Sequence, residues 1–193
     1  MDSQAVMVGV LLAGRPDDLG EWLADARAFE AAGADSLWVD PAAESALDPL
    51  ALLAALAALT SRSLLVTALP ESASPPEALA RTLATVRRLS HGRLALVADH
   101  ERLDELALAP GLRTFRRLPG EAGAFERTRG GDEPERWVQT PPPAGRAAWR
   151  AALADAAQGG ARGLLVPAGP RLLDILRNPD DPGGRRDLQL AQG

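Results

Sequence analysis

The chain contains 193 residues, of which 46% are hydrophobic, and it carries a net charge of −5. This length supports one domain with a substantial core, and the acidic balance argues against nucleic acid as a partner. Because the sequence contains no cysteine, lysine or tyrosine, it excludes a disulfide, a thiolate nucleophile, a lysine Schiff base and a tyrosine acid.

Strand-like apolar runs recur in the first half of the chain at a spacing of roughly 30 residues, which is the length of one strand plus one crossover helix. Helical patterns lie between these runs. The alternation is typical of a parallel α/β fold. The four predicted strands are Val6–Ala13, Ser36–Asp40, Leu64–Leu69 and Leu94–Ala98.

The helices between these strands have recognisable signals. Asp17 or Asp18 can cap the first helix, and Gly33 ends it. Asp48-Pro49 opens the second helix, whose stretch Leu50–Leu59 is apolar on almost every side and is therefore expected to be buried on several faces. The third helix begins at Pro75-Pro76.

The rhythm is lost after Asp99 for roughly 45 residues, longer than one strand-plus-helix unit. A final helix–strand–helix pattern closes the chain before a polar tail. The expected elements are a short helix at Glu101–Ala109, a strand at Leu112–Leu118, a hairpin or long loop formed by Phe125–Thr128 and Arg136–Thr140, a helix at Arg146–Ala157, a strand at Gly163–Pro167 and a helix at Arg171–Arg177.

Membrane insertion and secretion are not expected. The most apolar stretch, Leu50–Leu59, is much shorter than the ~18 residues that a membrane span needs. The first residues include Asp2 and lack the basic region of a signal peptide. We therefore expect a cytoplasmic protein.

Residues 26–98 resemble the bacterial-luciferase-like monooxygenase superfamily, whose members are flavin- or deazaflavin-dependent (β/α) barrels. Motifs such as Ala-Gly-Ala-Asp are common in barrels, but four segments in order at the right intervals are more specific. These segments are Phe29–Val39, Asp48-Pro49-Leu50 with Ala54-Ala55-Leu56 and Thr60-Ser61-Arg62, Pro75-Pro76 with Leu79-Ala80 and Leu83-Ala84-Thr85, and Leu89-Ser90-His91-Gly92-Arg93-Leu94.

The resemblance implies a TIM-type (β/α) barrel that is truncated or incomplete, with parallel strands and a hairpin-like insertion near residues 125–140. The chain is shorter than the ~250 residues typical of such barrels, so it cannot contain eight full units. We expect one domain over residues 1–178 and a polar tail over 179–193. Strand four also departs from the family, because it ends in Asp99-His100 where the family has a glycine-rich run.

Active sites of barrels lie at the carboxyl ends of the strands, so the residues after each predicted strand are the candidates. A histidine beside carboxylates is suited to proton transfer near neutral pH, and an arginine can contact an anion. Each of these loop residues could instead be a cap or simply solvated. The candidate catalytic residues are His100, Asp40 and Glu71, and the candidate cofactor-binding residues are Gly14, Arg15 and Asp99.

Two further expectations concern the histidines and metal binding. His91 follows the third helix at the opposite, amino-terminal face, which predicts a structural role. Only two histidines are present, at opposite ends of strand four, so no metal site is expected.

Two functional hypotheses remain open. The chain is either a flavin-dependent oxidoreductase acting on a small organic substrate, with FMN or deazaflavin implied by the resemblance, or a non-catalytic scaffold without cofactor that binds a small molecule or a partner. An incomplete barrel would leave strand edges exposed. The hairpin could cover them, with Trp137 as a hydrophobic wedge, or a second subunit could; by analogy with the family we expect a homodimer through helices two and three.

Overall fold

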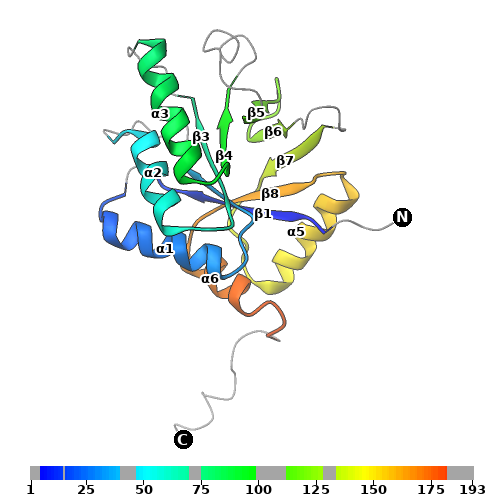
Figure 1. Ribbon diagram of the computed structural model, residues 1–193. Coiled ribbons are helices and arrows are strands. Elements are labelled where there is room, and N and C mark those ends of the chain that lie inside the picture. The colour runs from blue at the N-terminus through cyan, green and yellow to red at the C-terminus, as the bar shows by residue number, and fades with distance from the viewer. Residues whose placement is uncertain are drawn as a thin grey trace, which may run out of the picture.

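The computed structural model describes residues 5–14, 16–39, 47–69, 75–98, 112–127 and 134–181. Within them, eight strands pair in sequence order and close into a barrel (Figure 1). The predicted helix at Glu101–Ala109 and most of the tail, residues 182–193, lie outside the described residues. The strands are β1 Met7–Leu12, β2 Ser36–Val39, β3 Leu64–Ala68, β4 Leu94–Val97, β5 Arg113–Arg117, β6 Ala124–Arg127, β7 Glu135–Gln139 and β8 Gly163–Pro167.

Strand β6 is the one strand that runs against the others. β1 to β5 are parallel to their neighbours, β5–β6 and β6–β7 are antiparallel, and β7–β8 and β8–β1 are again parallel. The predicted hairpin is thus a β5–β6–β7 meander built into the barrel wall. The predicted TIM-type barrel with a hairpin is confirmed, and its described strands close the barrel, because each is paired on both sides.

The helices confirm most of the sequence signals. The Asp18 carboxylate accepts a hydrogen bond from the Glu21 amide at 2.9 Å, and the Asp48 carboxylate accepts from the amides of Leu50 and Ala51 at 2.7 and 3.2 Å. Gly33 follows the first helix with φ of 96°, the left-handed conformation that glycine adopts most readily. The described helices are α1 Leu19–Ala31, α2 Pro49–Leu59, α3 Pro76–Leu89, α5 Arg146–Gln158 and α6 Pro170–Arg177.

The core has two layers. The larger lies between the barrel wall and the helices and includes Trp22, Phe29 and the buried leucines of α2, as expected for a helix apolar on several faces. The smaller fills the barrel interior with inward-facing side chains of alternate residues. Trp38 and Trp137 belong to this inner layer, so Trp137 does act as the hydrophobic wedge predicted from the sequence.

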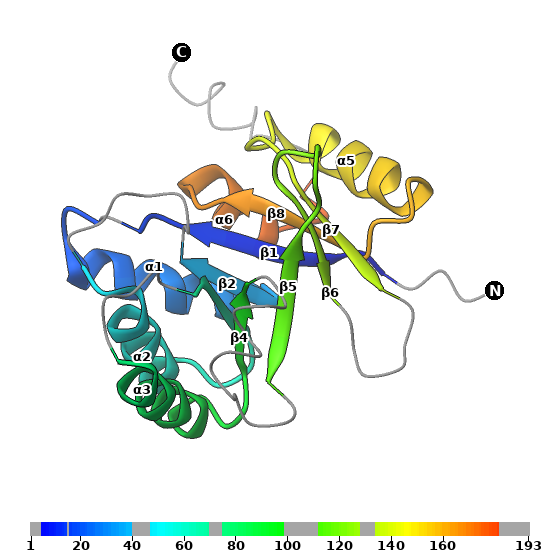
Figure 2. The ribbon, with the colours of Figure 1, turned by 90° about the horizontal axis from the view of Figure 1, so that it is seen from above.

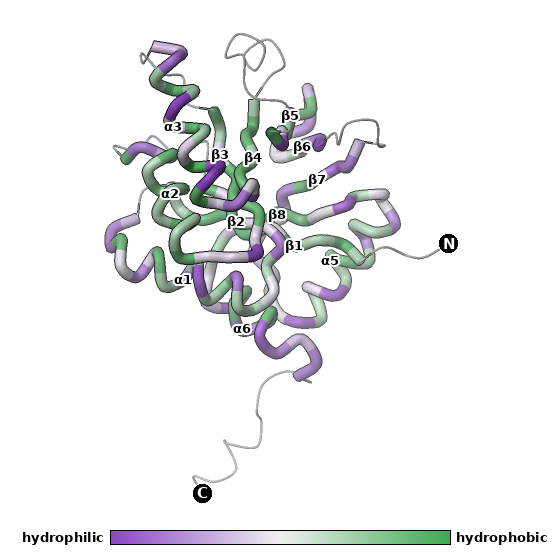
Figure 3. Tube along the Cα trace, in the orientation of Figure 1, coloured by the Kyte–Doolittle hydropathy of each residue, from purple (hydrophilic) through white to green (hydrophobic). Residues whose placement is uncertain are grey.

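The side of the barrel formed by β5 and β6 has no covering helix among the described residues (Figures 1 and 2). Its outer face is charged instead, and the register aligns Arg116, Glu126 and Arg136 across the three strands. Arg116 and Glu126 form an ion pair at 2.8 Å. Figure 3 accordingly shows hydrophilic segments in β5, β6 and β7 beside the hydrophobic β3 and β4. Charge on this face removes the need for a helix to cover it.

Closure within one chain also changes the basis of the homodimer hypothesis. None of the described strands has an open edge for a second subunit to cover. The homodimer therefore stays a prediction, without the support that an incomplete barrel would have given it. None of the helices in the described segments is long and apolar enough to cross a membrane.

Candidate functional site

The carboxyl ends of the parallel strands meet at one mouth of the barrel, where the candidate residues were predicted. Gly14 is the only one of them in the described part of the chain; it is buried and follows β1 after Ala13. The indole nitrogen of Trp22 on α1 donates to the Ala13 carbonyl at 2.9 Å, which fixes the turn after β1 against the first helix. The other candidates lie outside the described residues: Arg15, Asp40, Glu71, Asp99 and His100.

The described residues that line the barrel interior near this mouth are mainly apolar and differ in size. Leu11 and Ala68 are partly buried and pack on the inner layer of the core. Arg117, at the end of β5, is exposed, and its guanidinium carbon lies 5.5 Å from the centre of the Phe125 ring. A flat ring with an anionic tail fits such a surface, because apolar side chains can contact the ring and a guanidinium can contact the anion. These residues are therefore compatible with a flavin-type cofactor.

Four aromatic side chains form the floor below the mouth. Trp38 lies at the centre of this aromatic cluster, 4.6 Å from Phe115, 5.1 Å from Phe125 and 6.0 Å from Trp137 between ring centroids. Phe115 and Trp137 meet edge to face at 5.7 Å. All four are at most 3% exposed. The cluster fills the barrel interior and thereby separates its carboxyl end from its amino end.

Two glycines make room for this aromatic cluster. A Cβ atom at Gly9 would lie 2.8 Å from the Ser36 hydroxyl oxygen and 3.0 Å from the Trp137 ring. A Cβ atom at Gly163 would lie 2.5 Å from the same ring. The indole of Trp137 therefore rests on bare backbone of β1 and β8, which an alanine at either position would obstruct.

The opposite end of the barrel contains a buried ionic network. The Glu30 carboxylate accepts hydrogen bonds from the amides of Ser61, Arg62 and Ser63 at 2.8–3.0 Å. Burial by itself raises the pKa of Glu30, but these three amides and the nearby Arg93 guanidinium outweigh that effect and lower the pKa below its ordinary value of 4.5. Glu30 is thus held ionised and fixes the turn between α2 and β3.

Arg93 satisfies the carboxyl end of α2. Its guanidinium donates to the carbonyls of Thr60 and Ser63, each at 2.8 Å, and to the Thr60 hydroxyl at 3.1 Å. Burial lowers the pKa of Arg93, and the charge of Glu30 opposes that shift. A cation at this position also complements the negative end of the helix dipole.

His91 is exposed at the same amino-terminal end, with φ of 52°. Its amide donates to the Arg88 carbonyl at 3.1 Å, which terminates α3. The structural role predicted for His91 agrees with this geometry. The segments that carry the family resemblance around Glu30, Thr60–Arg62 and His91–Arg93 therefore meet at the end of the barrel opposite the mouth.

The family model described as luciferase-like monooxygenase matches residues 5–98. The amino-terminal half of this chain is luciferase-like. It contributes β1 to β4 and the three helices between them, whereas the β5–β6–β7 meander lies beyond the match. A search of curated proteins gives no match.

Solved structures give two kinds of likeness. EDTA monooxygenase from Chelativorans sp. BNC1 is 20% identical with a TM-score of 0.42 over 53% of this chain and 34% of that chain. Coenzyme F420-dependent tetrahydromethanopterin reductase from Methanopyrus kandleri is 23% identical with a TM-score of 0.39, over 56% and 32% of the two chains. This chain thus spans about a third of the length of these proteins.

The second kind of likeness extends over the whole barrel. Tryptophan synthase from Mycobacterium tuberculosis has a TM-score of 0.52 at 16% identity, over 92% of both chains. At this identity the likeness shows a shared fold alone. It agrees with the barrel closing in the second half of the chain, where the family match has ended.

Sequence reasoning does not single out a group of arginines at the amino end of the barrel. Arg113 and Arg127 occupy the same inward phase as Phe115 and Trp137 in the meander. The signal was present in the sequence, since basic residues alternate with aromatic ones along β5 and β6. The rule that barrel active sites lie at the carboxyl ends of the strands does not point to this end of the barrel.

Proposed function

We propose that this luciferase-like chain is an oxidoreductase that holds a flavin, FMN or a deazaflavin, at the carboxyl mouth of its barrel and acts on a small organic substrate. The family match over residues 5–98 carries the proposal, because that segment supplies β1 to β4 and their carboxyl ends. When bound, the reduced flavin would supply the electrons for the reaction. The protein's own share is to hold the ring, exclude water and offer a proton donor.

The proposed binding surface combines described and sequence-predicted residues. Leu11 and Ala68 would contact the ring, and Arg117 would contact an anionic group. Gly14 would allow close approach of the backbone after β1. Arg15 and Asp99 are proposed as further contacts to the cofactor, since they follow the ends of β1 and β4 in the sequence.

The proposed chemistry at the mouth rests on three residues that follow strands. His100 would transfer a proton, because an imidazole titrates near neutral pH. Asp40 and Glu71 would accept hydrogen bonds from substrate or ring. Asp40 directly follows the last residue of β2, and His100 comes two residues after Ala98, which supports their assignment to this end of the barrel.

Retention of flavin by the purified protein tests the proposal. We expect the visible flavin band to remain after FMN or deazaflavin is added and excess removed by desalting. Arg117→Gln should retain less, whereas Arg116→Gln removes a neighbouring charge on the outer face of β5 and should retain as much as the native protein. A folded protein that stays colourless with both flavins would contradict the proposal.

Turnover then tests the role of His100. In a flavin-loaded protein, His100→Ala should lose turnover while its circular dichroism and melting temperature remain native. His91→Ala is the matched control, because His91 is exposed at the opposite end of the barrel. Flavin binding with no change of turnover in His100→Ala would remove His100 from the mechanism and leave the cofactor site intact.

A non-catalytic scaffold is the alternative function. Aromatic filling of the barrel interior and the replacement of helical units by a meander favour it, because both stabilise a small barrel without contributing chemistry. Binding of a small molecule by a protein that retains neither flavin would support this alternative.

A further inference from the structure

A cavity of about 150 Å³ opens at the amino-terminal end of the barrel, on the far side of the aromatic cluster from the mouth. Met7, Ser36, Leu64 and Arg113 are the first residues of β1, β2, β3 and β5, and Arg127 is the last residue of the reversed strand β6. The lining is completed by Asp35, Arg62 and Trp137. The cavity therefore lies at the end of the barrel that the proposed function does not use.

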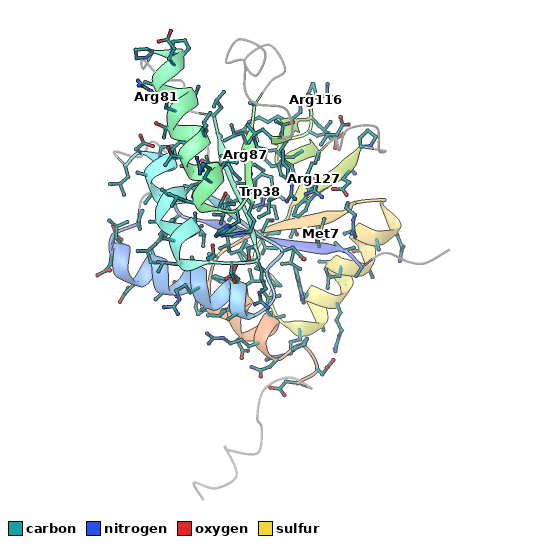
Figure 4. All side chains as sticks on the ribbon, in the orientation of Figure 1. Met7, Trp38, Arg81, Arg87, Arg116 and Arg127 are labelled. Atoms are coloured by element: carbon teal, nitrogen blue, oxygen red, sulfur yellow. The ribbon has the colours of Figure 1, made fainter. Side chains whose placement is uncertain are left out.

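Positive charge dominates the lining. Three arginines and one carboxylate, Asp35, line the cavity, and the Asp35 Oδ2 accepts the Val8 amide at 2.7 Å. Arg127 is 5% exposed, is paired with Glu135, and stacks against the rings of Phe115 and Trp137 at 5.7 and 6.0 Å. These contacts hold a buried guanidinium in a fixed position at the cavity wall. Figure 4 labels Arg127 and Met7, which both line the cavity.

Polar donors in the same wall add a second observation. Trp137 is 1% exposed, yet its indole nitrogen has no hydrogen-bond partner among the described residues. A buried donor without a partner is costly, so it calls for a ligand or a water in the cavity. The Ser36 hydroxyl accepts the Trp38 indole N–H at 2.9 Å, which leaves its own proton for donation to another acceptor.

The size of the cavity limits what it can hold. A volume near 150 Å³ accommodates a ligand of roughly benzene size or a few waters. A nucleotide or a flavin is much larger. A lining rich in guanidinium, indole and hydroxyl donors matches a compact acceptor, and guanidinium groups bind phosphate oxygens in bidentate geometry.

We propose that this amino-end cavity is a binding site for a phosphate group, either free phosphate or the phosphate of a small metabolite whose remainder extends into solvent. Arg113 and Arg127 contact the phosphate oxygens, and the Trp137 indole donates to one of them. Arg62 contributes positive charge at the rim. The site is independent of the proposed flavin site, since the aromatic cluster separates the two ends.

Calorimetric titration with inorganic phosphate at constant ionic strength tests the proposal, with chloride and acetate as comparison anions. We expect saturable binding of phosphate, and a dissociation constant about tenfold higher in Arg113→Gln. The matched control is Arg116→Gln, three residues further along β5 on the outer face, which changes the net charge equally. It should bind phosphate within about twofold of the native protein.

Trp137→Phe keeps an aromatic ring in the interior, but it removes the indole donor together with part of the ring volume. This variant should bind phosphate more weakly, and its binding is measured at a temperature where circular dichroism shows that it is folded, because the smaller ring packs the barrel less completely. Neither Arg113→Gln nor Trp137→Phe should alter flavin retention, so loss of the phosphate site and failure of the proposed function are distinguishable.

Several outcomes would overturn the proposal. Absence of saturable phosphate binding to the native protein would do so directly. Equal weakening in Arg113→Gln and Arg116→Gln would mean diffuse charge attraction in place of a site. Binding of acetate with no binding of phosphate would assign the cavity to carboxylates. If free phosphate binds, competition by a phosphorylated metabolite would show that the site also accepts the phosphate group of a larger molecule.

Discussion

Gly163 on β8 lies beneath the indole of Trp137 on β7, so a Cβ atom at Gly163 would come within 2.5 Å of the ring. The ring has little freedom to move, because Trp38 and Phe115 pack against it from inside the barrel. This relationship explains how a chain of 193 residues fills an eight-stranded barrel. The wide indole of Trp137 lies where the neighbouring strand β8 offers only the backbone of Gly163.

Gly163→Ala should therefore destabilise the fold by about 1–3 kcal/mol, the usual cost of forcing an extra methyl into a packed interior. Chemical denaturation measures the effect. Gly169→Ala is the control, since a Cβ atom at Gly169 meets nothing within 4 Å and its φ of −179° suits any residue. That change should be neutral or stabilising by up to about 1 kcal/mol. Equal stability of the two variants would mean that the Trp137 contact does not constrain the barrel.

Glu30 predicts an acid-dependent loss of stability. Its pKa is lowered in the folded protein, since the amides of Ser61–Ser63 and the Arg93 charge outweigh burial, which acts in the opposite direction. The stabilisation is fully present above the ordinary value of 4.5, and it disappears as the pH falls through the lower pKa of the folded state. The free energy of unfolding should decline over this acid range.

The Glu30→Gln variant should be less stable at neutral pH and should show a flatter decline with acid, because an amide cannot titrate. Asp25→Asn changes an exposed carboxylate on the same helix and should retain the native dependence. Parallel pH profiles of native protein and Glu30→Gln would assign the acid sensitivity to other groups.

Arg93 should be among the most sensitive positions in the luciferase-like half. Arg93→Met keeps much of the side-chain volume but leaves the carbonyls of Thr60 and Ser63 without their buried donor. We expect destabilisation of about 3 kcal/mol, typical of breaking a buried charged network. Arg88→Met removes an exposed arginine near the end of α3 and should change stability by less than about 0.5 kcal/mol. Similar melting temperatures for both variants would rule out this role.

The first half of the fold could be predicted from sequence because each unit there follows one periodicity. Buried parallel strands read as continuous apolar runs, and Asp18, Asp48 and Gly33 mark helix ends by local chemistry. The closure of the barrel could not be predicted. It depends on β6 pairing antiparallel on both sides and on Gly9 and Gly163 facing one indole, which are contacts between residues far apart in the chain.

The site was harder to predict than the fold for a related reason. Gly14 follows β1 in the sequence, and this position alone places it near the mouth. Position in the sequence does not predict the direction in which a loop side chain points. The amino-end cavity joins residues from six strands and two turns, so only the closed barrel brings Arg62, Arg113 and Arg127 together. The spacing of residues in the sequence can place each arginine at a strand end or in a turn, but it cannot show that the three arginines line one cavity.

The charged outer face of the meander should keep the barrel from associating through that side. Arg116 and Glu126 are partly exposed and paired, so their direct contribution to stability is small, about 0–1 kcal/mol. Replacing both by leucine would create an apolar patch on two adjacent strands that no helix of the described segments covers.

The double variant Arg116→Leu/Glu126→Leu should therefore fold with nearly native stability, yet form larger species than the native protein at micromolar concentration in sedimentation velocity. Arg81→Leu/Glu77→Leu, on the exposed side of α3, removes one charge of each sign away from the meander and serves as the control. If both double variants associate equally, added hydrophobicity alone is responsible. If neither double variant associates, charge on the meander is not what prevents association. The uncovered strands β5 and β6 would then carry apolar side chains and the protein would still not self-associate.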